Sequence, residues 1–183
     1  MNTMNAMIAI EQKLISDETL LRLLHYAPET FYDDPLSTDK PNLVDVDSDD
    51  YWSLVKKHIK KTPYVDDLTD ERIGRVIFYI GDTFPTDENA DFHDVRLMFD
   101  VFCHHSFEEG DYRLEKLMDH LHTSLKGYKL YRTDKDTAEK IGIGQISYLG
   151  SEPLGTVPGY IGHRMTYTVP IINGRVGRRG SRY

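Results

Sequence analysis

Apolar and polar residues alternate along the segment "FHDVRLMFDVFCHHS", residues 92–106. The apolar positions of one face are Val95, Leu97, Phe99, Val101 and Cys103. Because a period of two places these side chains on one side of a β-strand, the segment predicts a half-buried strand. The opposite face carries Arg96, Met98, Asp100 and Phe102. This second face is too apolar for a solvated surface and too charged for an ordinary core, so the sequence leaves open what covers it.

Four segments show helical spacing of apolar residues, and they lie at 4–15, 18–26, 49–61 and 112–126. Ser16 and Asp17, both of N-cap type, precede the second of them. The third begins with acidic residues and ends with lysines, which the helix dipole favours. The fourth carries leucines and a methionine at intervals of three or four, so it predicts an amphipathic helix with one buried stripe.

Four segments read as strands, and they lie at 72–84, 92–104, 143–156 with a break at Pro153, and 160–172. Residues 85–91 predict a hairpin loop, 106–111 predict a connection, and 128–142 predict no regular element. The order of elements predicts an α+β fold: a mainly antiparallel sheet of about four strands, with helix 112–126 packed on the face of Val95, Leu97, Phe99 and Val101. N-terminal helices complete this fold, with an extended loop and a tail as arms.

The second face of this sheet is expected to include Arg75, Ile77, Tyr79, Met98, Phe102 and Tyr148, depending on register. Either the N-terminal helices or a neighbouring subunit would then cover it. We expect residues 1–172 to form one domain, into which residues 27–50 insert as an acidic loop or arm. Residues 173–183 predict a flexible basic tail.

The 183-residue chain has a formal net charge of −8, which predicts repulsion of nucleic acid and anionic membranes by the body of the protein. No apolar stretch approaches the length of a membrane span, and no basic region precedes an apolar run at the N-terminus, so we expect neither an anchor nor a secretion signal. Cys103 is the sole cysteine, which excludes an internal disulfide. These features fit a reducing compartment.

Histidines are the first candidates for chemistry, and four of them are His104, His105, His120 and His122. With Asp94 or Asp119, imidazoles are suitable ligands for zinc or iron. Spacing argues against such a site, because neighbours on a strand point to opposite faces and residues two apart on a helix lie about 200° apart. Nucleophile and phosphate-loop motifs are absent, so we expect no catalytic residue, no metal site and no cofactor.

The C-terminal segment "NGRVGRRGSRY" departs from the acidic background. It carries Arg175, Arg178, Arg179 and Arg182 and no acidic residue, and the remaining chain has a formal charge of −12. Such a tail contacts nucleic-acid phosphates or the acidic surface of an adjoining subunit, or it is merely a frayed terminus. For an acidic protein we favour the protein contact over the nucleic-acid contact.

The order of these elements and their patterns of apolar and polar residues resemble those of phage tail-completion proteins, also called tail terminators. "RLMFDVFCHH", "LEKLMDHLHTSL" and "RMTYTVPII" stand where that family has a strand, a helix and a closing strand. The likeness covers residues 72–172, with a looser match at 4–26. Residues 29–50, helix 49–61 and the arginine tail are outside the family pattern, so head-closure and adaptor proteins of the neck remain alternatives.

The resemblance implies a structural virion protein without catalysis, assembled in the host cytoplasm. It implies a ring, usually of six subunits, at the head–tail neck, which ends the tail tube and meets the head connector or adaptor proteins. DNA threading the ring is a further expected contact, and a membrane is not. In such a ring the interface candidates are Arg96, Met98, Asp100, Phe102, Arg175, Arg178, Arg179 and Arg182. Two rival hypotheses are a small metal-binding enzyme that uses the histidines, and a host adaptor whose acidic loop 29–50 docks a basic partner.

Overall fold

The computed structural model describes residues 3–30, 32–65, 68, 71–86, 89–133, 140–155 and 157–172. Its helices are α1 (Thr3–Ile15), α2 (Glu18–His25), α3 (Asp49–His58), α4 (His105–Asp111) and α5 (Arg113–Leu125). Its strands are β1 (Ile59–Lys60), β2 (Gly74–Thr86), β3 (Asn89–His104), β4 (Lys129–Thr133), β5 (Lys140–Gln145), β6 (Ser147–Pro153) and β7 (Tyr160–Ile172).

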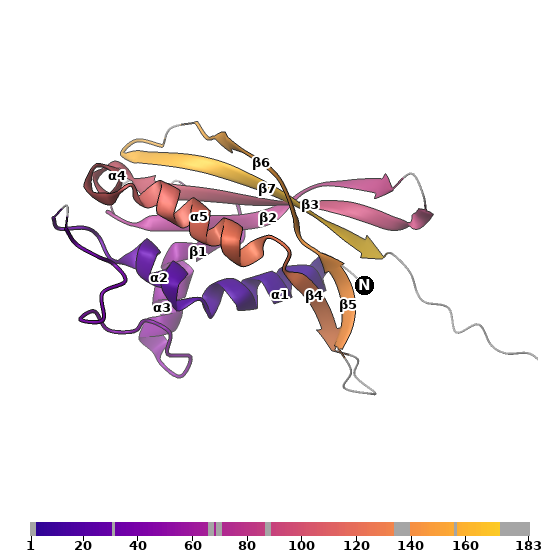
Figure 1. Ribbon diagram of the computed structural model, residues 1–183, viewed down its shortest axis with the longest axis horizontal. Coiled ribbons are helices and arrows are strands. Elements are labelled where there is room, and N and C mark those ends of the chain that lie inside the picture. The colour runs from indigo at the N-terminus through magenta and orange to yellow at the C-terminus, as the bar shows by residue number, and fades with distance from the viewer. Residues whose placement is uncertain are drawn as a thin grey trace, which may run out of the picture.

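The main sheet has the strand order β1-β2-β3-β7-β6, and β4 pairs with β5 in a separate hairpin (Figure 1). Within the main sheet only β1 and β2 are parallel. The predicted α+β fold with a mainly antiparallel sheet is therefore confirmed, with five strands in that sheet where about four were expected.

Helix α2 begins where the sequence predicts, because Asp17 caps it. The carboxylate of Asp17 accepts a hydrogen bond from the backbone N–H of Leu20 at 3.0 Å, and Nε2 of His120 on α5 lies 2.9 Å from the same group. Burial works to raise the pKa of Asp17, but these two hydrogen bonds outweigh it and hold the pKa below its usual value. The cap thus also connects α2 to α5.

Four local predictions are wrong. The helix predicted at 49–61 ends at His58, because Ile59 takes an extended backbone and pairs with Val76 of β2. The connection predicted at 106–111 belongs to α4, which Phe107 anchors in the core with no exposed surface. Residues 128–142 contribute β4 and part of β5, and the strand predicted at 143–156 is divided between β5 and β6.

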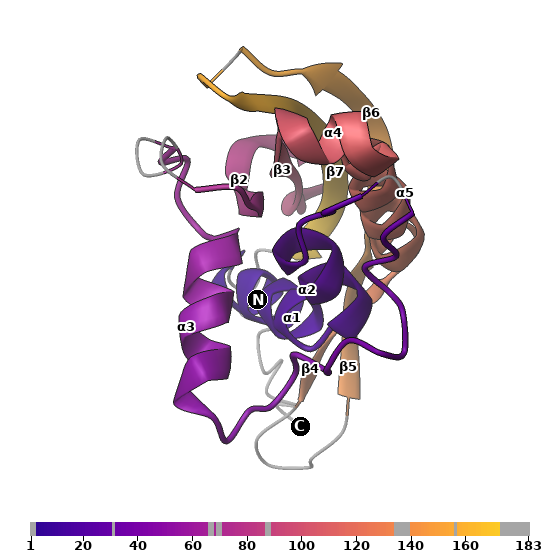
Figure 2. The ribbon, with the colours of Figure 1, turned by 90° about the vertical axis from the view of Figure 1, so that its left-hand side faces the viewer.

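One face of the sheet packs against the helices, and residues of all five described helices join the core there. Helix α5 buries Leu117 and Leu121 on the β3 residues Val95, Leu97 and Phe99, as predicted. Helices α1 and α2 contribute to the same core, with Ala6, Ile10, Leu14, Leu20, Leu21, Leu23 and Leu24. Figure 2 shows α1 and α2 below the sheet, with α5 beside it. Each fully buried leucine here contributes about 1.5–3 kcal/mol through removal of apolar surface from water.

The second face of the sheet is therefore not covered by the N-terminal helices. At one end the chain covers it itself, since Leu68 and Tyr160 pack on Ile77 and Phe102. Further along the strands Met98 is only half-buried. Tyr148 was expected here but lies on the helical face, where its ring contacts that of Tyr167 at 5.3 Å.

The acidic segment 27–50 runs along α2, and its described residues are tied to that helix. Buried Arg22 donates to the carbonyl oxygens of Pro35, Ser37 and Lys40. The carboxylate of Glu18 accepts from the backbone N–H groups of residues 43 and 44 at 2.8–3.0 Å. Two charged side chains of α2 thus supply the hydrogen bonds that a long irregular segment requires.

In the part of the chain that the structure describes, no helix combines the length and the apolar character needed to cross a membrane.

Candidate functional site

A network of charged and polar side chains crosses the second face of the sheet. Asp100 on β3, with 4% exposure, faces Arg164 on β7. The Nε and Nη2 atoms of Arg164 donate to the two carboxylate oxygens at 2.7 and 2.9 Å, and the hydroxyl of Tyr79 on β2 donates to Asp100 at 3.0 Å. The paired arrangement of Arg and carboxylate is the geometry of a strong charge-assisted hydrogen bond.

This network shifts the pKa values of Arg164 and Tyr79. Hydrogen bonding to Asp100 raises the pKa of Arg164 above its usual value. Burial, together with the nearby charge of Asp100, raises the pKa of Tyr79 to about 12. At neutral pH the Arg164 guanidinium is charged and the Tyr79 phenol is neutral.

The other residues predicted for an interface lie on both sides of this network. Phe102 is 5% exposed and buried by the chain's own residues. Met98 lies over Gly81 of β2 and accepts a hydrogen bond at its sulfur from Thr166. Arg96 lies 3.6 Å from Asp82 and above the ring of Phe84, whose exposure is 41%. Within one chain, Arg96 and Asp100 thus have different partners. The four tail arginines at 175, 178, 179 and 182 lie outside the described residues.

The four histidines do not converge. His120 contacts Asp17, and the ring of His122 contacts that of Tyr148 at 4.6 Å. His104 and His105 lie at the start of α4 with ring centroids 4.4 Å apart, so the expectation that they point to opposite strand faces is wrong, because His105 is already helical. Among the described residues, no group of three or more His, Cys, Asp or Glu is placed to hold a metal ion.

Cys103 is fully buried, and burial raises the pKa of its thiol far above the usual value. The thiol is neutral at physiological pH, which agrees with its predicted position on the core side of the strand.

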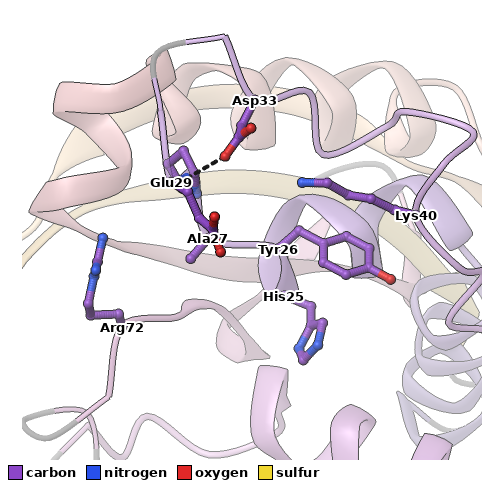
Figure 3. A pocket seen from close by; sticks show the side chains of 8 residues that line it. His25, Tyr26, Ala27, Glu29, Asp33, Lys40 and Arg72 are labelled. Carbon is purple, nitrogen blue, oxygen red and sulfur yellow. Dashed lines mark hydrogen bonds between the residues drawn. The ribbon is translucent and has the colours of Figure 1, made fainter.

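A pocket of about 670 Å³ opens between the C-terminal end of α2, the following loop and Arg72. Its lining residues are His25, Tyr26, Ala27, Pro28, Glu29, Asp33, Lys40 and Arg72. In Figure 3, Lys40 and Arg72 enter from opposite sides, and Glu29 lies between them. No sequence pattern predicts this pocket, because its cationic residues lie 32 positions apart along the chain.

His25, which lines this pocket, is hydrogen-bonded to the buried His58 behind it. Nδ1 of the buried His58 lies 2.8 Å from the carbonyl oxygen of Gly74, and its Nε2 lies 3.2 Å from Nδ1 of His25. Because a carbonyl oxygen only accepts, Nδ1 of neutral His58 carries the proton, and Nδ1 of His25 is the donor to Nε2. Burial is the largest cause that lowers the pKa of His58 to about 4, and it also lowers the pKa of His25.

Comparison with known proteins relates the chain to a bacterial prophage. The family model YomW matches residues 17–169. The SPbeta prophage-derived uncharacterized protein YomW of Bacillus subtilis (strain 168) is 27% identical over 174 residues, which cover 91% of this chain and 95% of that protein. The family match begins after α1, and it spans α2 to α5, most of the main sheet and the pocket.

Proposed function

Since this chain belongs to the phage-associated YomW family, we propose that it is a structural protein of a tailed-phage particle. In this proposal copies of the chain form a ring, of six subunits by resemblance to tail-completion proteins, at the neck between head and tail. The ring ends the tail tube and joins it to the head connector. A head-closure or adaptor role at the same neck is the alternative.

The observation that carries the proposal is the second face of the sheet. The helices on the sheet all pack on the other face, and the described residues of the chain cover this face at one end only. The remainder presents a half-buried methionine beside an ordered Arg–carboxylate pair and an exposed aromatic ring under Arg96. An apolar centre with satisfied polar groups around it is the composition of a protein–protein interface.

The acidic body and the basic tail support the same assembly. The tail's four arginines complement a chain whose remainder is acidic, so contact between neighbouring subunits lowers the charge repulsion within a ring.

Replacing Met98 with aspartate tests the role of this face. Met98 is partly accessible, so the single subunit is expected to fold, whereas a carboxylate without a partner at the centre of a subunit contact should weaken assembly by at least about a hundredfold. Sedimentation velocity of wild type and variant measures the change.

The matched control is Ile8→Asp, which places the same charge at a 39% exposed apolar residue of α1, in the helical layer. This control should assemble as the wild type does. Equal loss of assembly in both variants, or in neither, would exclude the second face as the specific contact.

Loss of the gene from its phage distinguishes the two neck roles. A tail terminator predicts DNA-filled heads and separate tails whose tubes vary in length, while a head-closure protein predicts tails of uniform length and heads that lose DNA. Electron microscopy of the lysate measures both. Complete infectious particles at the normal yield would contradict either neck role.

A further inference from the structure

The pocket beside α2 combines two cations whose hydrogen-bonding capacity is largely unused. Nε of Arg72 donates to the hydroxyl of Ser106 at 3.1 Å, which leaves its two terminal nitrogens without a partner in the described part of the chain. The ammonium group of Lys40 lies 5.1 Å from the ring centroid of Tyr26. Its charge also contributes to the lowered pKa of Asp33, although no carboxylate of the described residues lies within ion-pair distance of it. Both side chains are thus held at the pocket wall by contacts that leave N–H donors free.

The pocket also contains two carboxylates, those of Asp33 and Glu29. Asp33 accepts hydrogen bonds from the backbone N–H groups of Glu29 and Thr30, and these bonds hold its pKa below the usual value. Its carboxylate is therefore committed to the turn that forms the wall. Glu29 is exposed and has no hydrogen-bonded or ionic partner for its carboxylate among the described residues. Free donors therefore outnumber free acceptors.

The walls that carry the two cations are ordered by the fold. The carbonyl oxygen of Lys40 accepts from buried Arg22, and the hydroxyl of Tyr26 donates to the carbonyl oxygen of Pro41 at 2.8 Å. Ser106, the partner of Arg72, lies in the first turn of α4 and 2.7 Å from Nδ1 of His104. Preorganised donors bind a ligand with a smaller loss of conformational entropy than mobile ones.

From this arrangement we infer that the pocket binds an oxyanion, a carboxylate or phosphate group, between Arg72 and Lys40. A guanidinium presents paired donors that match the two oxygens of such a group, and the ammonium supplies a second charge from the opposite wall. The volume of about 670 Å³ exceeds that of a single ion, so the group belongs to a ligand of small-molecule size. This site goes beyond the proposed neck role and does not depend on it.

Calorimetric titration of the purified protein tests the inference, with inorganic phosphate and succinate as separate probes at constant ionic strength. At least one probe should bind saturably, and the tighter of the two identifies the class of oxyanion. Arg72→Gln and Lys40→Gln should each weaken binding about tenfold, because each removes charge-assisted hydrogen bonds. Glu29→Gln should strengthen binding of the probe, since that variant removes a negative charge that repels the anion.

Lys56→Gln is the matched control, because Lys56 is an exposed residue of α3 that does not line the pocket. It changes net charge as the two pocket variants do and should leave binding unchanged. The altered side chains are partly exposed, and equal melting temperatures of all variants confirm folding. Failure of both probes to bind, or equal weakening by Lys56→Gln and Arg72→Gln, would overturn the inference.

Discussion

Replacement of Arg113 by alanine is expected to lower the free energy of unfolding by about 3–5 kcal/mol, the cost of removing one partner of a buried ion pair. Arg113 has no exposed surface. Its Nη1 donates to the carbonyl oxygens of Leu23 and Tyr26 at 2.6 and 2.7 Å, and its Nε donates to Asp111 at 3.0 Å. The truncation would leave two carbonyl oxygens at the C-terminal end of α2 without their donor and would leave the carboxylate of Asp111 with Lys116 as its remaining cation.

Urea unfolding of the wild type and the variant measures this loss. Arg96→Ala is the control, because the side chain of Arg96 is 42% exposed and lies 3.6 Å from a single carboxylate. A surface pair of this kind contributes about 0–1 kcal/mol. Similar small losses in both variants would show that Arg113 does not connect α2 to the α4–α5 corner as the structure indicates.

The second large effect concerns pH. The pKa of His58 is about 4 in the folded chain, against an ordinary value of 6.5. The unfolded chain therefore binds more protons between these two values, so stability is fully present above pH 6.5 and is lost as the pH falls toward 4. The difference between the two pKa values corresponds to about 3 kcal/mol of unfolding free energy. The physical reason is burial without an anion: His25, Lys57 and Arg75 are the titratable groups that face His58, and each opposes its positive charge.

Unfolding free energies of wild type and His58→Asn across this pH range test the effect. The variant should be less stable at neutral pH but should lose much less stability as the pH falls. His105→Asn, at an exposed residue, should retain the wild-type slope. Asp17 and Asp33, whose pKa values are also lowered, lose stability in the same direction as the pH falls, but in a more acidic range around the ordinary carboxyl pKa of 3.8, and they are common to all three proteins. A wild-type slope in the His58 variant would refute this origin of the acid sensitivity.

The local periodicity of apolar residues was sufficient to predict the long strands. The strand predicted at 160–172 matches β7, and that at 92–104 lies within β3, because a buried face with a period of two specifies both the element and its orientation. It was insufficient for β1, which has two residues and exists through its pairing with β2. Helix α4 has seven residues, too few for a helical spacing of apolar residues to be recognised in the sequence.

The candidate sites depend on contacts between residues distant in sequence, which no local pattern reveals. Asp100 finds its partner Arg164 64 positions away on β7. Register alone places Arg164 opposite Asp100. The pocket likewise forms where a loop after α2 meets Arg72, and Arg113 was recognisable in sequence as a charged residue at the start of a helix but not as a buried one.

In the proposed assembly, copies of this chain join through the open part of the second sheet face. Negative-stain electron microscopy of the purified full-length protein at micromolar concentration tests it most directly. We expect rings with a central hole in the wild type, and their loss in Met98→Asp. Single subunits of uniform size in the wild-type images would contradict it.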